Sequence, residues 1–261
     1  MKRMVLVGAV VAALVSACNY GSPATKQPFA AATRPASVVV ASASPRVSLP
    51  DRSPGPSPAP SSSPSPEDIH PIGWYATVRA IDPDTRARMK YSWHRGCPVP
   101  IRNLRLIRMS YLGFDREAHM GEMVVHKNVA AAVVKVFHKM YDANYPIRRM
   151  KLIDDYRGDD NRSMAADNTS AFNCRRVTGG TEWSQHSYGW AIDINPIENP
   201  YVTRSKVLPP AGRKYADRRS RARGVIHHGD RVWRAFRSIR WGWGGDWRSI
   251  KDYQHFSSTG R

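Results

Sequence analysis

The chain has 261 residues and a net charge of +19, from 40 Lys and Arg against 21 Asp and Glu. This length allows one large domain or two small ones and excludes a larger set of domains. The positive charge indicates nucleic acid as the partner of a cytosolic protein, and an anionic wall or membrane surface as the partner of an exported one. Solubility alone would also explain it, so the sign of the charge does not separate these classes.

The first 18 residues have the pattern of an export signal. Met1–Arg3 is basic, and Met4–Val15 is an apolar run without charge. That run is shorter than the ~20 residues that cross a bilayer and is typical of a secretory signal. Val15–Cys18 resembles a bacterial lipobox, so we expect residues 1–17 to be removed and Cys18 to carry lipid. The alternative is an ordinary signal in which Cys18 is incidental.

This leader predicts where the protein works. A lipid on Cys18 would anchor it to the bacterial membrane on the extracytoplasmic side, facing the cell wall. We therefore expect the membrane, and anionic wall polymers, to be its partners in preference to nucleic acid. The sequence does not indicate an oligomer, and we expect a monomer.

Residues 18–71 are expected to form a disordered tether. Eleven of the 20 prolines lie between residues 19 and 70, with a bias toward Ser-Pro pairs. Such a composition cannot build a core and favours polyproline character. The globular domain is therefore expected over 72–261, which is long enough to bury one core.

Three cysteines are an odd number, which needs an explanation in an exported protein. If Cys18 carries lipid, Cys97 and Cys174 are left as a pair in an oxidising compartment. A disulfide between them would stabilise the domain by roughly 4 kcal/mol through loop closure. The alternatives are two separate buried thiols, or a zinc thiolate role for Cys174.

The first half of the domain is expected to contain strands and one helix. Leu104–Leu112 has apolar residues on both faces and predicts a strand. Glu122–Val125 indicates another strand or the lead into a helix. Apolar residues at helical spacing predict a helix over Asn128–Ala143, ended by a Tyr-Pro pair. Ile147–Ile153 is expected to be a strand.

A polar loop is expected next, over Asp154–Asn161. Its four acidic residues raise a calcium-loop alternative, but their spacing does not fit an EF-hand. Trp190–Ile194 predicts a short buried strand that presents Asp193 at its end. Arg213–Arg223 contains six basic residues and is expected to be an exposed loop, either solvated or in contact with wall polyanions.

The C-terminal part completes the expected fold. Asp230 is a suitable N-cap for a helix with one apolar face. Trp241–Gly245 alternates tryptophan with glycine and predicts a tight turn. Helices and strands without a regular βαβ rhythm indicate the α+β class. We expect a single domain with a central, largely antiparallel sheet flanked by helices.

Two clusters carry the side chains that suggest chemistry. His186 and Asp193 lie seven residues apart, and Asp252 lies three residues before His255. A catalytic zinc takes three protein ligands, so two imidazoles and one carboxylate would suffice and leave Asp252 as a separate base. Spacing alone leaves ordinary roles open for both acids, and His227-His228 is an alternative ligand pair.

A family resemblance strengthens the metal hypothesis. Ser184-x-His186-x-x-Gly189-x-Ala191-x-Asp193, together with Asp252-x-x-His255, resembles the metallopeptidase family of D-alanyl-D-alanine carboxypeptidases and endolysin-type L-alanyl-D-glutamate peptidases. The likeness extends over most of the region from Gly96-Cys97-Pro98 to Phe256-Ser257. It implies that His186, Asp193 and His255 are Zn²⁺ ligands on the sheet and that Asp252 is the catalytic acid/base.

The same resemblance implies roles for three further residues. Arg175 matches the family arginine that holds the substrate carbonyl and stabilises the developing oxyanion. Arg176 is its adjacent competitor for that role. Ser184 is implied to support the ligand shell or to contact substrate.

The resemblance implies a zinc-dependent peptidase that hydrolyses peptidoglycan stem peptides. Carboxypeptidases of the family often place a glutamate before the last histidine, whereas this chain has Asp252, as endolysin-like members do. Cleavage of a terminal D-Ala and cleavage of an internal L-Ala-D-Glu-type bond therefore both stay open. The alternative is a non-catalytic, cell-wall-binding lipoprotein that retains the fold.

Overall fold

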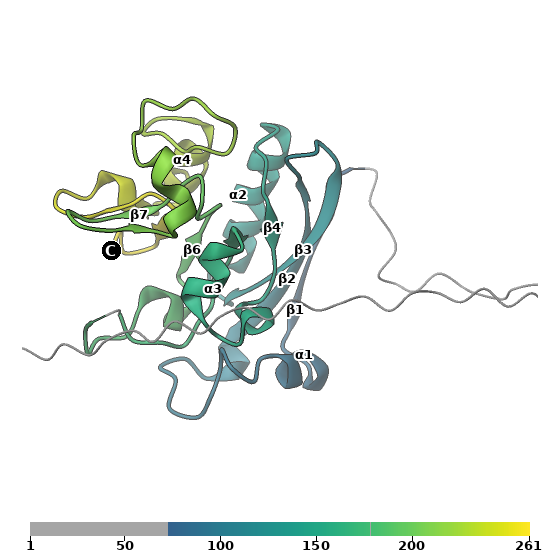
Figure 1. Ribbon diagram of the computed structural model, residues 1–261. Helices are drawn as coiled ribbons and strands as arrows, with labels where there is room; N and C mark the ends of the chain where they lie inside the picture. Colours follow the sequence, from purple (N-terminus) through teal and green to yellow (C-terminus); the bar gives the residue numbers. More distant parts are fainter. Residues whose placement is uncertain (1–72, 178) are drawn as a thin grey trace, which may run out of the picture. The chain divides into compact units, whose positions relative to one another are not determined.

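The computed structural model describes residues 73–177 and 179–261 (Figure 1). The predicted signal peptide, Cys18, the tether and the first residue of the predicted domain lie outside the described residues. Within the described part, no helix is both long and apolar enough to cross a membrane.

The first sheet is antiparallel and has the order β1-β2-β3. Its strands are β1 (Ala76–Ala80), β2 (Leu104–Leu112) and β3 (Ala118–His126). The strand predicted over Leu104–Leu112 is confirmed with the same bounds. Glu122–Val125 belongs to a strand and does not begin a helix, because it pairs with β2 along its whole length.

Two helices follow from local sequence signals in this half. α1 (Pro83–Arg88) begins where the Asp82 side chain accepts a hydrogen bond from the Thr85 main chain. The predicted helix is α2 (Ala130–Asp142), whose apolar face is buried. It packs against β2 and against α4 (Figure 1). The short 3₁₀-helix η1 (Ile101–Asn103) leads into β2.

The strand predicted over Ile147–Ile153 is mostly wrong. Only β4 (Arg149–Met150) is a strand, and it pairs in parallel with β5 (Asn168–Thr169). The chain leaves the strand because it turns into η2 (Ile153–Tyr156), where the Asp154 carboxylate accepts hydrogen bonds from two main-chain amides, those of Tyr91 and Ser92.

The polar loop predicted over Asp154–Asn161 is largely helical. After η2, Asp159 accepts a hydrogen bond from the Arg162 main chain and so caps α3 (Asp160–Ala165). Asp154 and Asp159 of this run therefore act as turn and cap residues, and none of its acids belongs to the candidate metal groups found among residues 73–177 and 179–261.

Two further three-stranded antiparallel sheets form the C-terminal half. One has the order β6-β11-β9, from β6 (Ala191–Asp193), β11 (His255–Ser257) and β9 (Gly242–Trp243). The other has the order β10-β7-β8, and its members are β10 (Lys251–Asp252), β7 (Tyr201–Val202) and β8 (Val207–Leu208). The strand predicted to present Asp193 at its end is confirmed as β6.

The remaining C-terminal predictions are confirmed in part. α4 (Arg231–Arg237) is capped by Asp230, as expected, and its Phe236 stacks on Phe256 of β11 at 4.0 Å between ring centroids. The tight turn predicted over Trp241–Gly245 is wrong at its start, because Gly242 and Trp243 pair with β11. The chain turns only at η5 (Gly244–Asp246).

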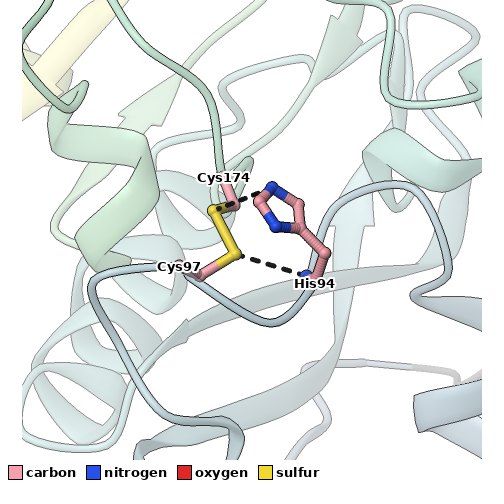
Figure 2. A group of neighbouring side chains, drawn as sticks. All are labelled: His94, Cys97 and Cys174. Atoms are coloured by element: carbon pink, nitrogen blue, oxygen red, sulfur yellow. Dashed lines mark hydrogen bonds between the residues drawn. A yellow bond between two sulfur atoms is a disulfide. The ribbon is translucent and has the colours of Figure 1, made fainter.

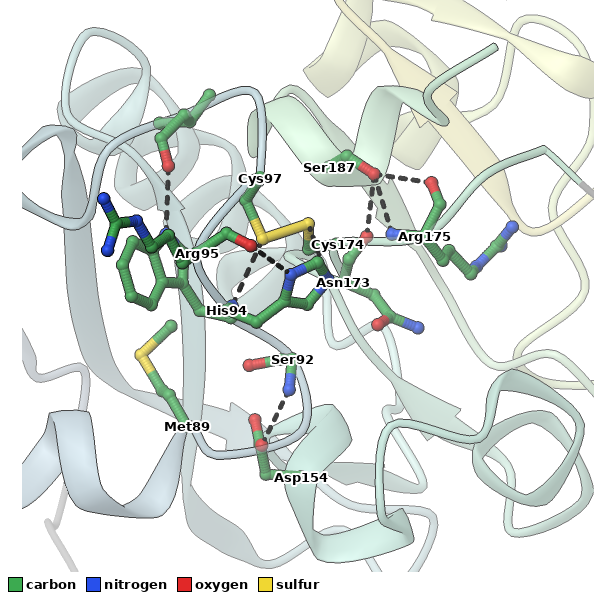
Figure 3. Close-up of a disulfide and its surroundings, with 12 residues drawn as sticks. Met89, Ser92, His94, Arg95, Cys97, Asp154, Asn173, Cys174, Arg175 and Ser187 are labelled. Carbon is green, nitrogen blue, oxygen red and sulfur yellow. Dashed lines mark hydrogen bonds between the residues drawn. A yellow bond between two sulfur atoms is a disulfide. The ribbon is translucent and has the colours of Figure 1, made fainter. Parts of the chain in front are cut away.

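A disulfide between Cys97 and Cys174 joins segments 77 positions apart in sequence (Figure 3). It is part of the smaller of two buried clusters, because Cys174 belongs to that cluster with Met89, Leu104 and Phe172, and Cys97 packs against it. The larger cluster contains Phe137, Ile192 and Phe256, and its side chains come mainly from β2, β3, α2, α4 and the β6-β11-β9 sheet. The α+β class with largely antiparallel strands is confirmed, and the single sheet is replaced by several small ones.

Candidate metal centre

Three buried side chains of distant segments converge at the C-terminal sheets. His186 Nε2 lies 3.2 Å from Asp193 Oδ2, and His255 Nδ1 lies 3.1 Å from Asp193 Oδ1. The two facing imidazole nitrogens are 3.3 Å apart. The three predicted ligands thus form one group, in which each contributes an atom within 4.8 Å of the others.

Strand pairing and one tight turn bring these residues together. Asp193 ends β6 and is the register partner of His255, the first residue of β11. His186 lies on η3 (Gln185–Tyr188), which ends at Gly189 with φ +70°. A Cβ at position 189 would lie 2.5 Å from the His126 main-chain nitrogen, so this close approach requires glycine.

Main-chain carbonyls set the orientation of both imidazoles. His186 Nδ1 lies 2.6 Å from the Ala171 oxygen, and His255 Nε2 lies 3.1 Å from the Arg261 main-chain oxygen. A carbonyl oxygen only accepts, so these outer nitrogens carry the hydrogens. In the neutral imidazoles the inner nitrogens then present lone pairs toward the Asp193 carboxylate.

This arrangement fits a divalent cation. Two lone pairs and one carboxylate converge in a buried space, where they repel unless a proton or a cation lies between them. Two nitrogens and one oxygen are also the ligand set of a catalytic zinc with an open position. The donor atoms of His186, Asp193 and His255 are therefore suited to bind a divalent metal ion.

The buried charges perturb one another. Burial alone would raise the pKa of Asp193, but the neighbouring His186 and His255 imidazoles hold it well below its ordinary value. Burial opposes protonation of His255, but its hydrogen bond to Asp193 and the charges of Asp193 and Asp252 together outweigh burial and raise the pKa of that imidazole.

Asp252 lies beside this group at the end of β10. Its Oδ1 atom is buried and has no hydrogen-bond partner within the described part of the chain. Burial, followed by repulsion from Asp193, raises the pKa of Asp252 to about 7. Gly244 permits this placement, because a Cβ there would lie 2.8 Å from the Asp252 Cβ. The two strands β10 and β11, separated by Tyr253 and Gln254, place Asp252 near His255 without a helix.

The segment that carries Arg175 is fastened to the turn of His186. The Arg175 amide donates to Ser187 Oγ at 2.9 Å, and that hydroxyl donates to the Arg175 carbonyl at 2.7 Å (Figure 3). Ser184 also takes part, because its amide donates to the Arg175 carbonyl and its Oγ accepts from the His186 amide. Ser184 therefore supports the ligand turn.

The two adjacent arginines differ in their contacts. Arg175 forms an ion pair with Asp160 at 2.7 Å, and about a quarter of each side chain is exposed. Arg176 is exposed, and its guanidinium stacks on the Trp183 ring at 3.8 Å. The sequence alone did not predict the contacts of Asp160 and Ser187 with Arg175. Asp160 belongs to an acidic run that indicated a solvated loop, and its contact with Arg175 has no local sequence signal.

The other candidate ligands lie elsewhere. His227 and His228 contact the Ser220 carbonyl and Asp246, and belong to neither candidate metal group. The second group joins His94 to Cys97 and Cys174, with His94 Nε2 3.6 Å from Cys174 Sγ (Figure 2). Its two sulfurs are bonded to each other, so they act as a covalent link in this structure.

The family comparison covers this C-terminal site. Residues 178–258 match a family model described as D-alanyl-D-alanine carboxypeptidase. The match supports a D-alanyl-D-alanine carboxypeptidase-like family for this C-terminal segment. It includes His186, Asp193, Asp252 and His255, whereas Arg175 lies just before it. Neither the curated proteins nor the solved structures gave a match to the chain.

The similarity of this segment to a carboxypeptidase model supports a function only at a coarse level. It supports a peptidase that acts on peptidoglycan. The buried His-Asp-His group lies within the carboxypeptidase-like segment, on the sheet region formed by β6 and β11.

Proposed function

We propose that the protein is a zinc-dependent peptidase that hydrolyses peptidoglycan stem peptides. The observation that carries this proposal is the convergence of His186 Nε2, Asp193 and His255 Nδ1 in one buried group beside Asp252. His186, Asp193 and His255 would hold the ion. A bound zinc ion would supply a Lewis acid that activates water and polarises a carbonyl.

Asp252 is proposed to move the proton. A general base works best when its pKa lies near the operating pH, and burial followed by repulsion from Asp193 raises the pKa of Asp252 to about 7. The carboxylate would accept the proton from the attacking water and then, as the acid, deliver it to the leaving amine. Its unpartnered Oδ1 atom leaves one acceptor site for that proton.

Arg175 is proposed to stabilise the substrate carbonyl. Its main chain is held on the turn that carries His186, which supports a fixed position relative to the ligands. A guanidinium there would stabilise the charge that develops on the oxygen. Arg176 is the weaker candidate, because its guanidinium is stacked on Trp183.

Metal removal tests this proposal directly. Chelation should abolish hydrolysis of muropeptides, and one equivalent of zinc should restore it, with zinc content measured independently of activity. Asp252→Asn should still bind zinc but lose at least a hundredfold in rate. Full activity in this variant would remove Asp252 from the mechanism. Wall binding without hydrolysis in the zinc-loaded wild type would favour the non-catalytic alternative.

The products of muropeptide hydrolysis would identify the bond that is cut. Mass spectrometry of defined muropeptides would distinguish loss of a terminal D-Ala from cleavage of an internal L-Ala-D-Glu-type bond. The aspartate at position 252 resembles endolysin-like members, whereas the matched family model is described as D-alanyl-D-alanine carboxypeptidase, so both bonds are candidates. A product pattern of D-Ala release alone would assign the carboxypeptidase activity instead.

Membrane anchoring is proposed from the sequence of residues 1–18 alone. A lipid on Cys18 would hold the peptidase at the outer side of the membrane. Replacing Cys18 with alanine should release the protein from the membrane fraction. Unchanged retention of Cys18→Ala would show that another element anchors it.

A further inference from the structure

A cationic segment adjoins the proposed active site. Residues 204–223 contain eight basic residues and a single acidic one, Asp217. The basic residues are Arg204, Lys206, Arg213, Lys214, Arg218, Arg219, Arg221 and Arg223. The segment includes the β7–β8 turn, β8, the 3₁₀-helix η4 (Pro210–Tyr215) and the loop that follows. The exposed loop predicted over Arg213–Arg223 thus begins with a helical turn.

Strand pairing fixes this segment next to Asp252. β7 pairs with β10, and Tyr201 is the register partner of Asp252. β8 pairs with the other edge of β7, so the segment begins within two strands of the proposed catalytic acid. A ligand held on the segment would therefore lie close to the metal group.

Arg218 ties the loop to the same site. Its guanidinium donates to the carbonyl oxygen of Glu198 at 2.8 Å and to Asn199 Oδ1 at 3.0 Å. It also lies 4.2 Å from the ring centroid of Tyr253, which follows Asp252 directly. Arg218 is thus a structural anchor that holds the loop on the turn between β10 and β11.

Most of the other cations of the segment make no ion pair or side-chain hydrogen bond within the described part of the protein. Arg213, Lys214 and Arg221 are exposed, and none has an ion pair among the residues that the structure describes. Lys214 lies 4.9 Å from the ring centroid of the adjacent Tyr215, and Arg223 donates to the Phe114 carbonyl. The ion pair of Arg219 with Asp217 is at the surface, and both side chains are more than half exposed. Like charges gathered in this way repel one another, so the fold itself gains nothing from them.

We propose that this cationic segment binds an anionic polymer that is attached to, or interwoven with, the peptide substrate. This inference rests on the proposed function. The guanidinium group forms paired hydrogen bonds with carboxylate and phosphate oxygens, and six of the eight cations are arginines. The ligand chemistry is therefore a chain of closely spaced anionic oxygens.

A membrane surface is the less favoured partner. Binding to a lipid surface usually combines cations with exposed apolar side chains that enter the interface. The large exposed apolar residues of the described chain lie outside the segment, at Tyr75, Val78, Tyr91, Val177 and Ile250. The segment therefore presents charge without large exposed apolar side chains. Such a surface suits a soluble polyanion better than a membrane.

Docking on the segment would favour hydrolysis of polymeric substrate over hydrolysis of small fragments. A polymer held on the segment raises the local concentration of its peptides at Asp252. Removing the cations should raise KM for wall polymer several-fold and leave KM for a short soluble muropeptide unchanged. The electrostatic origin also predicts that added salt weakens the preference for polymer.

The test uses the full chain and two matched triple variants. The first replaces Arg213, Lys214 and Arg221 with glutamine. The control replaces Arg79, Lys127 and Lys135, which are exposed on other elements and have no ion pair among the described residues. Binding is measured by fluorescence titration with long-chain polyphosphate and with poly-L-glutamate, at several salt concentrations, and by co-sedimentation with vesicles containing half anionic phospholipid.

We expect the first variant to bind at least one polyanion roughly tenfold more weakly at low salt, with a smaller salt dependence, and the control to change much less. The stronger of the two polymers identifies the anionic group. Equal losses in both variants would overturn the proposal in favour of net charge. Vesicle binding that depends on the first triple substitution and exceeds polyanion binding would overturn it in favour of a membrane.

This measurement is separate from hydrolysis. Binding to polyphosphate or poly-L-glutamate requires no metal and no turnover, so it can be measured in Asp252→Asn. A variant that binds polyanion but never cleaves muropeptide would contradict the proposed function alone. Cleavage of muropeptide without segment-dependent binding would contradict the docking surface alone.

Discussion

At the scale of single residues, the site depends on the main-chain and side-chain groups that orient its functional side chains. His186 and His255 each donate outward to a main-chain oxygen, which leaves their inner nitrogens for the proposed metal ion. Asp160 has a comparable relation to Arg175, since their 2.7 Å ion pair sets the direction of the guanidinium. A residue of α3 outside the matched segment therefore affects the proposed chemistry.

Replacing Asp160 with asparagine should weaken catalysis while the metal centre stays intact. Without the carboxylate, the Arg175 guanidinium loses its charged partner and samples other positions. We expect kcat to fall roughly tenfold with little change in KM, because the proposed role of Arg175 is exerted in the transition state. Zinc content should be unchanged. Asp155→Asn, in the same acidic run, is the matched control, and an equal effect in both variants would contradict this role.

A second residue-scale prediction concerns the buried carboxyl groups of Glu198 and Asp167. Burial, then the Asp167 carboxylate, raises the pKa of Glu198 to about 8. Because the folded pKa exceeds the unfolded one, the protonated form stabilises the fold below about pH 4.5, and this contribution is lost as the pH rises through 8. Glu198→Gln should remove that loss, raising the free energy of unfolding at pH 9 by on the order of 2 kcal/mol. Denaturant titrations at pH 5 and pH 9 measure it, and an equal effect at both pH values would refute it.

At the scale of elements, the sequence predicts long elements and short motifs better than two-residue strands. The spacing of His186, Asp193, Asp252 and His255 is local and can be recognised directly. The helix α2 has enough turns to show its periodicity. Two-residue strands such as β7, β9 and β10 have no period, so their pairing depends on contacts that only the folded chain defines.

Gly189 provides an element-scale prediction. Alanine there would adopt φ +70° and meet the His126 main-chain nitrogen at 2.5 Å. The strain and the clash together should lower the free energy of unfolding by roughly 2–4 kcal/mol. Because the turn carries His186, zinc affinity should fall as well.

A glycine without close neighbours separates these two contributions. Gly229 has φ +77° and nothing within 4 Å of an added Cβ. Gly229→Ala should therefore lose only about 1 kcal/mol from backbone strain and keep its zinc affinity. Thermal unfolding and zinc competition measure both variants. Equal losses at the two positions would show that packing of Gly189 on β3 is not what positions His186.

At the scale of the whole molecule, the disulfide and the site are supported by different parts of the core. Ile192, Ile194 and Phe256, the sequence neighbours of Asp193 and His255, belong to the larger cluster. The disulfide is part of the smaller cluster and ties the loop of Cys97 to the segment that precedes Arg175. Loss of the disulfide should therefore lower the free energy of unfolding more than it disturbs the positions of the proposed metal ligands.

Replacing Cys97 and Cys174 together with serine should lower the free energy of unfolding by about 4 kcal/mol, since the bond closes a loop over 77 positions. For a domain of this size that corresponds to a fall in Tm of roughly 10 °C. The folded variant should keep one zinc, because Asn173 and Arg175 retain their main-chain bonds to the His186 turn. Wild-type protein treated with a dithiol reductant should reproduce the shift. An unchanged Tm in both samples would show that the bond does not stabilise the fold, whereas zinc loss from folded protein would show that it positions the site.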